Sequence, residues 1–307
     1  MSKEMNFREL EYFVEIAREK NLSHAAQKLY VGQPTLTKYM QRLQEQWGIP
    51  LFERGTRELK LTYAGERFLS YAQQLLAQKR SLENEMAEIR KMNAGVLKVG
   101  MPSVRCSLLL PAVLPVFRER YPKVDFQIIE ESSVKLDEAL LHGKIDLAFF
   151  ALCSPLEDLA YEVLREDVIY AVFPMGHPIR ERAILCENGE LGIELEWIKD
   201  ETLLVQKPTQ RQGEYILREL KEKNISPKKI QEHSNIRAAI ALAAEGYGVA
   251  FISGSLLRYL KEICSFDTYR LIGAVSGFPF VAAYRKGAFI PDYARDFINL
   301  AAQFANS

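Results

Sequence analysis

Residues 23–65, SHAAQKLYVGQPTLTKYMQRLQEQWGIPLFERGTRELKLTYAG, decide the fold of the N-terminal part of this chain. Apolar residues recur at helical spacing in two short runs, first Ala25, Ala26 and Leu29, then Leu36, Met40, Leu43 and Trp47. The two runs are separated by a turn at residues 31–34. Gly32 permits a positive φ angle there, and Pro34 is tolerated in the first turn of a helix, where its missing N–H has no partner to lose. The pattern predicts a helix-turn-helix.

The outward face of the second helix is suited to DNA. Short hydrogen-bonding groups near its N-terminus are followed by cations, in the order Gln33, Thr35, Thr37, Lys38, Gln41 and Arg42. The N-terminal residues of a recognition helix meet base edges, and basic groups meet phosphates. An ordinary helical hairpin with a solvated polar face is the alternative. A basic β-wing, predicted from strands at residues 51–54 and 59–61 with Arg54 and Arg57 beside them, favours the DNA interpretation.

These residues resemble the LysR-type transcriptional regulators. The matching positions are Ser23, Ala25, Ala26, Leu29, Gln33, Pro34, Leu36, Thr37, Lys38, Leu43, Leu51, Phe52, Arg54, Arg57, Leu61, Thr62, Ala64 and Gly65. The resemblance implies base contacts from Gln33, Pro34, Thr37 and Lys38, wing contacts from Arg54 and Arg57, and a phosphate contact from Ser23. Thr37 stands where the family usually has Ser, and Gln44 stands where it usually has Glu; neither change removes a hydrogen-bonding group from the DNA face.

Composition is that of a globular protein. The 307 residues are 48% hydrophobic, and 40 basic side chains balance 40 acidic ones, so any electrostatic attraction to DNA is local to the N-terminal unit. No apolar run of transmembrane length and no secretory signal occurs, and we expect a cytoplasmic protein without a membrane partner. The four cysteines have no CxxC spacing, which makes a structural zinc site or a disulfide framework improbable.

Residues 62–92 contain no proline, and their apolar residues follow a heptad pattern. The seam is Phe68, Ala72, Leu75, Lys79, Leu82, Met86 and Ile89. It predicts one long linker helix that pairs with its copy in a homodimer, with Lys79 fixing the register. A helix packed on its own domain is the alternative. A twofold protein can place two recognition helices on successive half-sites, and the resemblance implies that two such dimers form a homotetramer.

From residue 95 onward the pattern alternates between strands and helices, which predicts an α/β unit with a largely parallel sheet covered on both faces. Strands are predicted at 96–100, 124–130, 145–151, 167–174, 202–206, 249–252 and 273–284, and helices at 106–121, 134–142, 212–223, 236–245 and 293–304. The resemblance implies two Rossmann-like subdomains similar to periplasmic binding proteins. The predicted organisation is a winged helix-turn-helix at 1–65, a linker helix at 62–92 and an effector domain at 95–307, with subdomain one at 95–164 and 267–307 and subdomain two at 165–266.

Ligands of open α/β sheets bind beyond the carboxyl ends of the strands. Residues there with hydroxyl, amide, thiol or cationic groups, or beside them, are Pro102, Ser103, Arg105, Ser132, Ser133, Cys153, Lys207, Thr209 and Asn235. They predict a cleft for a small-molecule effector, and Arg105 and Lys207 favour an anion such as a carboxylate. Plain helix capping is the alternative for each Ser and Thr.

Three other functions have less support in the sequence. A thiol-based redox sensor would use Cys106, at a helix start, and Cys153. A transport-type binding protein would use residues 95–307 alone, but the DNA-binding unit argues against it. An enzyme is not expected, because the four histidines are scattered and no catalytic or metal-binding spacing occurs. The sequence therefore predicts an effector-controlled transcriptional regulator that binds double-stranded DNA and needs no cofactor or metal.

Overall fold

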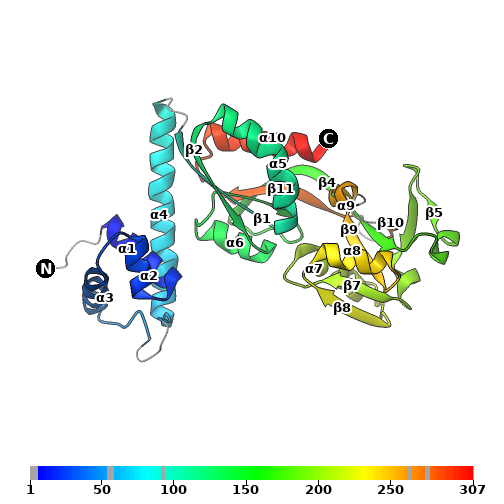
Figure 1. The fold of residues 1–307 in the computed structure, drawn as a ribbon, viewed down its shortest axis with the longest axis horizontal. Helices are drawn as coiled ribbons and strands as arrows, with labels where there is room; N and C mark the ends of the chain where they lie inside the picture. The colour runs from blue at the N-terminus through cyan, green and yellow to red at the C-terminus, as the bar shows by residue number, and fades with distance from the viewer. Residues whose placement is uncertain (1–5, 54–58, 91–93, 261–264, 274–276, 307) are drawn as a thin grey trace.

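The computed structural model describes residues 6–53, 59–90, 94–260, 265–273 and 277–306. A helical N-terminal unit and one long helix stand beside an elongated two-part α/β unit (Figure 1). The helix-turn-helix prediction is confirmed by α1 (Phe7–Glu19), α2 (Leu22–Lys28) and α3 (Gln33–Trp47). Asn21 caps α2 by accepting hydrogen bonds from two main-chain N–H groups, and α3 begins after Gly32 with Pro34 in its first turn.

The core of the N-terminal unit is aromatic. The ring of Phe13 lies 5.2 Å from that of Phe52 and 4.6 Å from that of Phe68, centroid to centroid. At the base of the wing, Phe52 pairs with Leu61 in an antiparallel bridge. The predicted contacts Arg54 and Arg57 lie outside the described residues. The side-chain oxygen of Gln44 accepts hydrogen bonds from the main-chain N–H groups that begin the wing, at 2.9 and 3.2 Å.

The predicted linker helix is α4 (Tyr63–Ile89), and the heptad seam divides between two environments. Phe68 packs against the core of the N-terminal unit and Ala72 is buried, whereas Leu75, Leu82 and Met86 are 45%, 58% and 44% exposed. Lys79 forms ion pairs with Glu11 and Glu83 of its own chain, at 3.7 and 3.3 Å.

Further along α4, Arg80 joins the helix to the α/β unit. Its guanidinium donates to the carbonyl of Gly143 at 3.0 Å and to the carboxylate of Asp146 at 2.8 Å. Asp146 also accepts from the main-chain N–H of Lys98 on the first strand. The linker helix is therefore attached to both neighbouring units within one chain.

The first half of the α/β unit contains a mixed sheet in the order β2-β1-β3-β11-β4. Its strands are β1 (Ala94–Met101), β2 (Lys123–Glu130), β3 (Leu147–Ala151), the first part of β4 (Leu159–Phe173) and β11 (Gly277–Arg285). β1, β2 and β3 are parallel, and β11 is antiparallel to both of its neighbours. Helices α5 (Ser103–Arg120) and α10 (Asp292–Asn306) pack on one face and α6 (Ser133–Leu141) on the other. The adjacent residues Phe149 and Phe150 accordingly point into different cores.

The second half contains the remaining strands. They are the end of β4 together with β5 (Ile184–Leu185), β6 (Leu191–Glu194), β7 (Thr202–Gln206), β8 (Lys229–His233), β9 (Val249–Ser253) and β10 (Asp267–Ile272). The helices are η1 (Pro178–Glu181), η2 (Leu195–Ile198), α7 (Arg211–Glu222), α8 (Ile236–Ala244) and α9 (Gly254–Leu260). Leu203 and Val205 of β7 pack into one core and Leu204 into the other, so this sheet is also covered on both faces.

Two long connections join the halves. β4 pairs with β11 in the first half and with β9 and β10 in the second, so a single strand runs through both. The strand predicted at 273–284 is preceded by β10, which pairs within the second half. The chain therefore returns to the first half between Ile272 and Gly277, later than the predicted boundary at 267. A Cβ at Gly277 would lie 1.7 Å from the carbonyl oxygen of Asp167, so only glycine fits this crossing.

Candidate functional site: a DNA-facing helix and an inter-domain cavity

The start of α3 presents the predicted DNA-facing residues. Gln33, Pro34, Thr35 and Lys38 are exposed, and Thr37 is half-buried with its hydroxyl donating to the carbonyl of Gln33 at 3.1 Å. The hydroxyl of Ser23 donates to the side-chain oxygen of Gln33 at 3.0 Å. This bond fixes the Gln33 amide so that its NH₂ group is free to donate to a base edge.

Arg42 lies in a different setting from the other predicted DNA contacts. Its guanidinium pairs with Glu9 of α1 and lies 5.9 Å from the centre of the Tyr39 ring. The charge of Arg42 is therefore compensated within the chain. Lys38, on the same face, forms no ion pair among the described residues and is the cation available to DNA.

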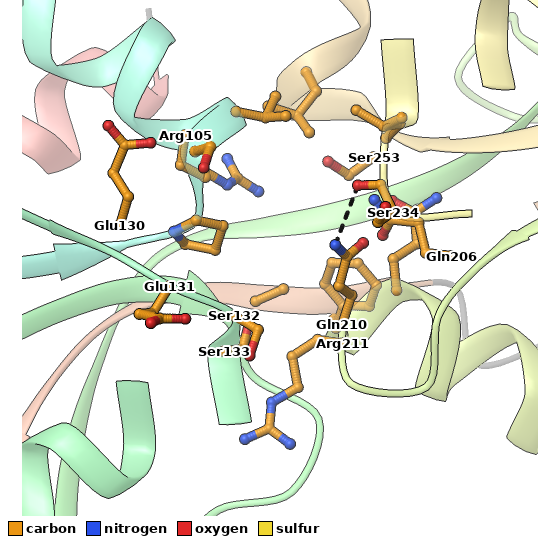
Figure 2. A pocket seen from close by; sticks show the side chains of 18 residues that line it. Arg105, Glu130, Glu131, Ser132, Ser133, Gln206, Gln210, Arg211, Ser234 and Ser253 are labelled. Carbon is orange, nitrogen blue, oxygen red and sulfur yellow. Dashed lines mark hydrogen bonds between the residues drawn. The ribbon is translucent and has the colours of Figure 1, made fainter. Parts of the chain in front are cut away.

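A cavity of about 310 Å³ lies between the two halves of the α/β unit (Figure 2). Apart from Phe278 at the start of β11, its lining residues lie at or beyond the carboxyl ends of six strands, three from each half: β1, β2 and β3, then β7, β8 and β9. This is the position at which open α/β sheets bind ligands. Of the predicted effector residues, the lining contains Pro102, Ser103, Arg105, Ser132 and Ser133.

Four predicted effector residues lie outside the lining. Lys207 and Thr209 are exposed on the loop after β7. The side chain of Asn235 caps α8, accepting from the N–H groups of Arg237 and Ala238 at 3.1 and 3.4 Å. The thiol of Cys153 contacts the carbonyl of Arg211 at 3.4 Å.

The sequence indicated the loops at 206–210 and 234–235 of the second half, but Lys207, Thr209 and Asn235 were selected from them and the residues that line the cavity were not. These residues are Gln206, Gln210, Arg211, Gln212, Ser234 and Ser253, to which the first half adds Glu130 and Glu131. For Ser253, its position directly after the strand predicted at 249–252 was a usable signal. In Figure 2 the Gln210 amide donates to the carbonyl of Ser234 at 3.3 Å, and the other Gln210 side-chain atom, Oε1, is buried without a partner among the described residues.

Three helices begin at the cavity without a side-chain cap. Pro102, Ser132 and Gln210 are the N-cap residues of α5, α6 and α7, and none of them makes a side-chain capping hydrogen bond. The first N–H groups of a helix have no partner within the helix and favour negative charge. The cavity thus combines three sets of main-chain donors with several hydroxyl and amide side chains.

Arg105 belongs to a buried network at the crossing between the halves. Its guanidinium donates to the hydroxyl of Ser255 at 2.8 Å and pairs with Asp167 at 3.3 Å, and it lies 4.0 Å from the centre of the Phe280 ring. Asp167 also accepts from the N–H of Ser255 at 2.9 Å. Ser253 of the cavity contacts Ser255 at 3.3 Å, so the lining is connected to this network.

Arg211 and Asp137 form a second buried pair, which joins α7 of one half to α6 of the other. Each side chain is 8% exposed. Burial raises the pKa of Asp137 to about 6, against the opposing effect of Arg211. Arg211 also pairs with Glu214 at 3.0 Å. Figure 2 shows its guanidinium pointing away from Ser234 and Ser253. Both arginines of the lining therefore have carboxylate partners.

The two cysteines considered for redox sensing are poorly activated. Burial raises the pKa of Cys106 to about 12 and that of Cys153 to about 11. A reactive cysteine requires the opposite shift, because the thiolate is the nucleophile. Within the described part of the chain, no group of His, Cys, Asp and Glu side chains is arranged to hold a metal ion, and no helix is long and apolar enough to cross a membrane.

Comparison with known proteins agrees with this architecture. Residues 7–66 match the family model of the bacterial regulatory helix-turn-helix protein, lysR family, and residues 90–306 match that of the LysR substrate binding domain. The fold and the two sites define a DNA-binding regulator with an attached ligand-binding domain. The chain belongs to the LysR family of transcriptional regulators, as its sequence predicts.

Individual relatives extend over most of the chain. A probable cat1 operon transcriptional activator of Acinetobacter lwoffii is 28% identical over 284 residues, which cover 92% of this chain and 90% of the relative. The regulator BenM of Acinetobacter baylyi is 28% identical over 82% of this chain and 81% of its own length.

Solved structures share the fold. A full-length OxyR variant from Pseudomonas aeruginosa has a TM-score of 0.73 at 23% identity, covering 99% of this chain and 95% of its own. Full-length CbnR complexed with its target DNA has a TM-score of 0.61 at 23% identity, covering 98% and 100%.

Proposed function

We propose that this protein is a sequence-specific transcriptional regulator whose DNA binding responds to a small monoanionic effector in the inter-domain cavity. The main support for an effector is that three helix N-termini without side-chain caps meet at one cavity. Such termini bind carboxylates through main-chain N–H groups. Support from cations is weaker than the sequence predicts, because Arg105 is paired with Asp167 and Lys207 lies outside the lining.

The charged side chains that line the cavity favour an effector with a single negative charge. Arg105 and Arg211 are both neutralised by carboxylates, while Glu130 and Glu131 add negative charge to the lining. A second carboxylate on the ligand would lack a free cation among the described lining residues. A dicarboxylate should therefore bind more weakly than a monocarboxylate of similar size. The thiol alternative has no such support, since burial raises the pKa of both cysteines.

The test is fluorescence anisotropy on DNA from directly upstream of the protein's own gene, across salt concentrations and against scrambled DNA. We expect specific, salt-sensitive binding that a small monocarboxylate alters and hydrogen peroxide does not. Matched dicarboxylates and the neutral amides of active compounds serve as controls. Equal responses to an acid and its amide would contradict an anionic effector, and absence of any preference over scrambled DNA would contradict sequence-specific binding.

Replacing Gln33 by alanine should relax base preference at one operator position. The amide held by Ser23 supplies hydrogen bonds to a base edge, and a good base contact contributes about 1–3 kcal/mol of discrimination. Anisotropy with a set of single-base operator variants measures this effect. Arg54→Ala is the comparison, because loss of a wing contact to the DNA backbone weakens binding to all sequences and reduces the salt dependence. Uniform weakening by Gln33→Ala would contradict its base-reading role.

We also propose that α4 pairs with its copy in a homodimer, and that two dimers form a tetramer. Support comes from Tyr71, Leu75, Leu82 and Met86, which are exposed on one side of α4 at spacings of four, seven and four residues. Such a stripe is the seam expected of paired helices.

Leu82→Lys should weaken dimerisation by at least about 10-fold, because each symmetric interface loses the burial of two leucine side chains. Sedimentation velocity over a concentration series measures the change. The leucine is 58% exposed in one chain, so the fold should be retained. Leu185→Lys is the matched control, since Leu185 is 70% exposed on β5, far from α4. Equal behaviour of the two variants would contradict the proposed seam.

A further inference from the structure

Tyr30 is unusual among the residues of the N-terminal unit. It lies in the turn between α2 and α3, and 95% of it is exposed. Its φ angle is 53°, in the left-handed region that a residue with a side chain rarely adopts. A large aromatic side chain is thus displayed in full at a backbone position better suited to glycine or asparagine.

The side chain has no visible role in the fold. Its neighbours Leu29 and Val31 pack against the core of the unit, but Tyr30 does not. Across the described residues, its phenol takes part in no hydrogen bond and its ring contacts no other ring or cation. Only its main chain is engaged, through an N–H that donates to the carbonyl of Gln27 at 3.3 Å. The backbone of Tyr30 is strained although its side chain stabilises nothing within the chain, which indicates that the side chain contacts another molecule.

The position of Tyr30 indicates where that function lies. It precedes by three residues Gln33, whose amide is fixed by Ser23 at the exposed start of the recognition helix. In a helix-turn-helix this end of the helix enters the major groove, and the segments around it lie over the DNA backbone. The nearby cation Lys28 is already paired with Glu19 at 2.6 Å. The phenolic hydroxyl of Tyr30 is a neutral donor beside it, without a hydrogen-bond partner among the described residues.

We propose that Tyr30 is a DNA-backbone contact, whose phenolic O–H donates to a phosphate oxygen beside the bases that Gln33 reads. The proposal rests on the DNA-binding function proposed above. Tyrosine hydroxyls are among the side chains that bind phosphates and fix the register of a protein on its operator without reading sequence. The contact would position Gln33 rather than contribute base preference of its own.

Two variants of the full-length protein test the contact. Tyr30→Asn removes the side chain and suits the left-handed backbone, and Tyr30→Phe removes only the hydroxyl. We expect each to bind both operator and scrambled DNA about 3- to 10-fold more weakly, with an unchanged slope of log K against log salt, because no charge is lost. The melting temperature of Tyr30→Asn should be equal to or above that of the wild type, which a structural role for the tyrosine would not allow.

Tyr63→Phe is the matched control, because Tyr63 is a second tyrosine of the same region and is 78% exposed at the start of α4. It should bind DNA like the wild type. Wild-type affinity in both Tyr30 variants would overturn the proposal, as would a loss confined to operator DNA or an equal loss in Tyr63→Phe. If the unsubstituted protein itself showed no salt-sensitive DNA binding, the proposed function would fail and this contact with it. The two failures are therefore distinguishable.

Discussion

Replacing Asp167 by alanine is expected to lower the free energy of unfolding of the effector domain by about 3–5 kcal/mol, because it leaves the buried guanidinium of Arg105 without its counter-ion. Asp167 is fully buried at the crossing between the halves, and it also accepts from the N–H of Ser255. The remaining partners of Arg105 are a hydroxyl and the face of Phe280, which compensate a buried charge poorly. Urea denaturation followed by Trp197 fluorescence measures the change.

The control for this variant is Asp158→Ala. Asp158 is exposed and its carboxylate has no partner among the described residues, so its loss should change the unfolding free energy by no more than about 0.5 kcal/mol. Combining Arg105→Met with Asp167→Leu should restore much of the stability, since the pair is then replaced by apolar groups. Equal stability of Asp167→Ala and Asp158→Ala would show that the network contributes little.

Replacing Arg211 by methionine should destabilise the protein by about 3 kcal/mol at pH 8 and by clearly less at pH 5. Burial raises the pKa of Asp137 to about 6 in the folded protein, above the value of about 3.9 typical of an unfolded chain. The folded protein therefore binds a proton on Asp137 more tightly than the unfolded chain does. Charged Asp137 lowers the free energy of unfolding above pH 6, and this loss of stability disappears as the pH falls toward 4. Without Arg211, which lowers this pKa, the cost at pH 8 becomes larger.

Denaturation at pH 5 and pH 8 measures this difference, and effector binding provides a second measurement. Because Asp137 and Arg211 belong to opposite halves, loss of the pair should also loosen closure of the cavity and weaken effector affinity. Adding Asp137→Asn to Arg211→Met should abolish the difference between the two pH values. A loss of stability that is independent of pH would contradict the assignment to Asp137.

The architecture was predictable from sequence where a strong pattern coincides with burial. The helix-turn-helix, the long α4 and the apolar strands such as β3 have periodicities that tertiary contacts do not override. β8 was missed because KIQEH is polar and the strand lies at an edge, with one neighbour and little burial. The first part of β4 was missed because Glu162, Arg165 and Glu166 interrupt its apolar pattern.

The effector cavity was predictable only in part. Its location followed from the rule that ligands bind at strand ends, which correctly indicated Ser103, Ser132 and Ser133 as lining residues. Which loop side chains turn inward depends on local capping and on distant partners. Arg105 and Arg211 are paired with carboxylates 62 and 74 residues away, and no periodicity in the sequence reports such contacts.

Because α4 is attached both to the N-terminal unit and to the α/β unit, a rotation of one unit is transmitted to the other along the helix. Near its start, the ring of Phe68 packs in the aromatic core of the N-terminal unit, and further along Arg80 donates a hydrogen bond to Asp146 beside the first sheet. The 17 residues from Arg80 back to Tyr63 span roughly 26 Å, so a tilt of about 8° at Arg80 would displace the start of the helix by roughly 3.5 Å. Motions too small to reshape the effector domain could in this way move a recognition helix by about one base-pair step.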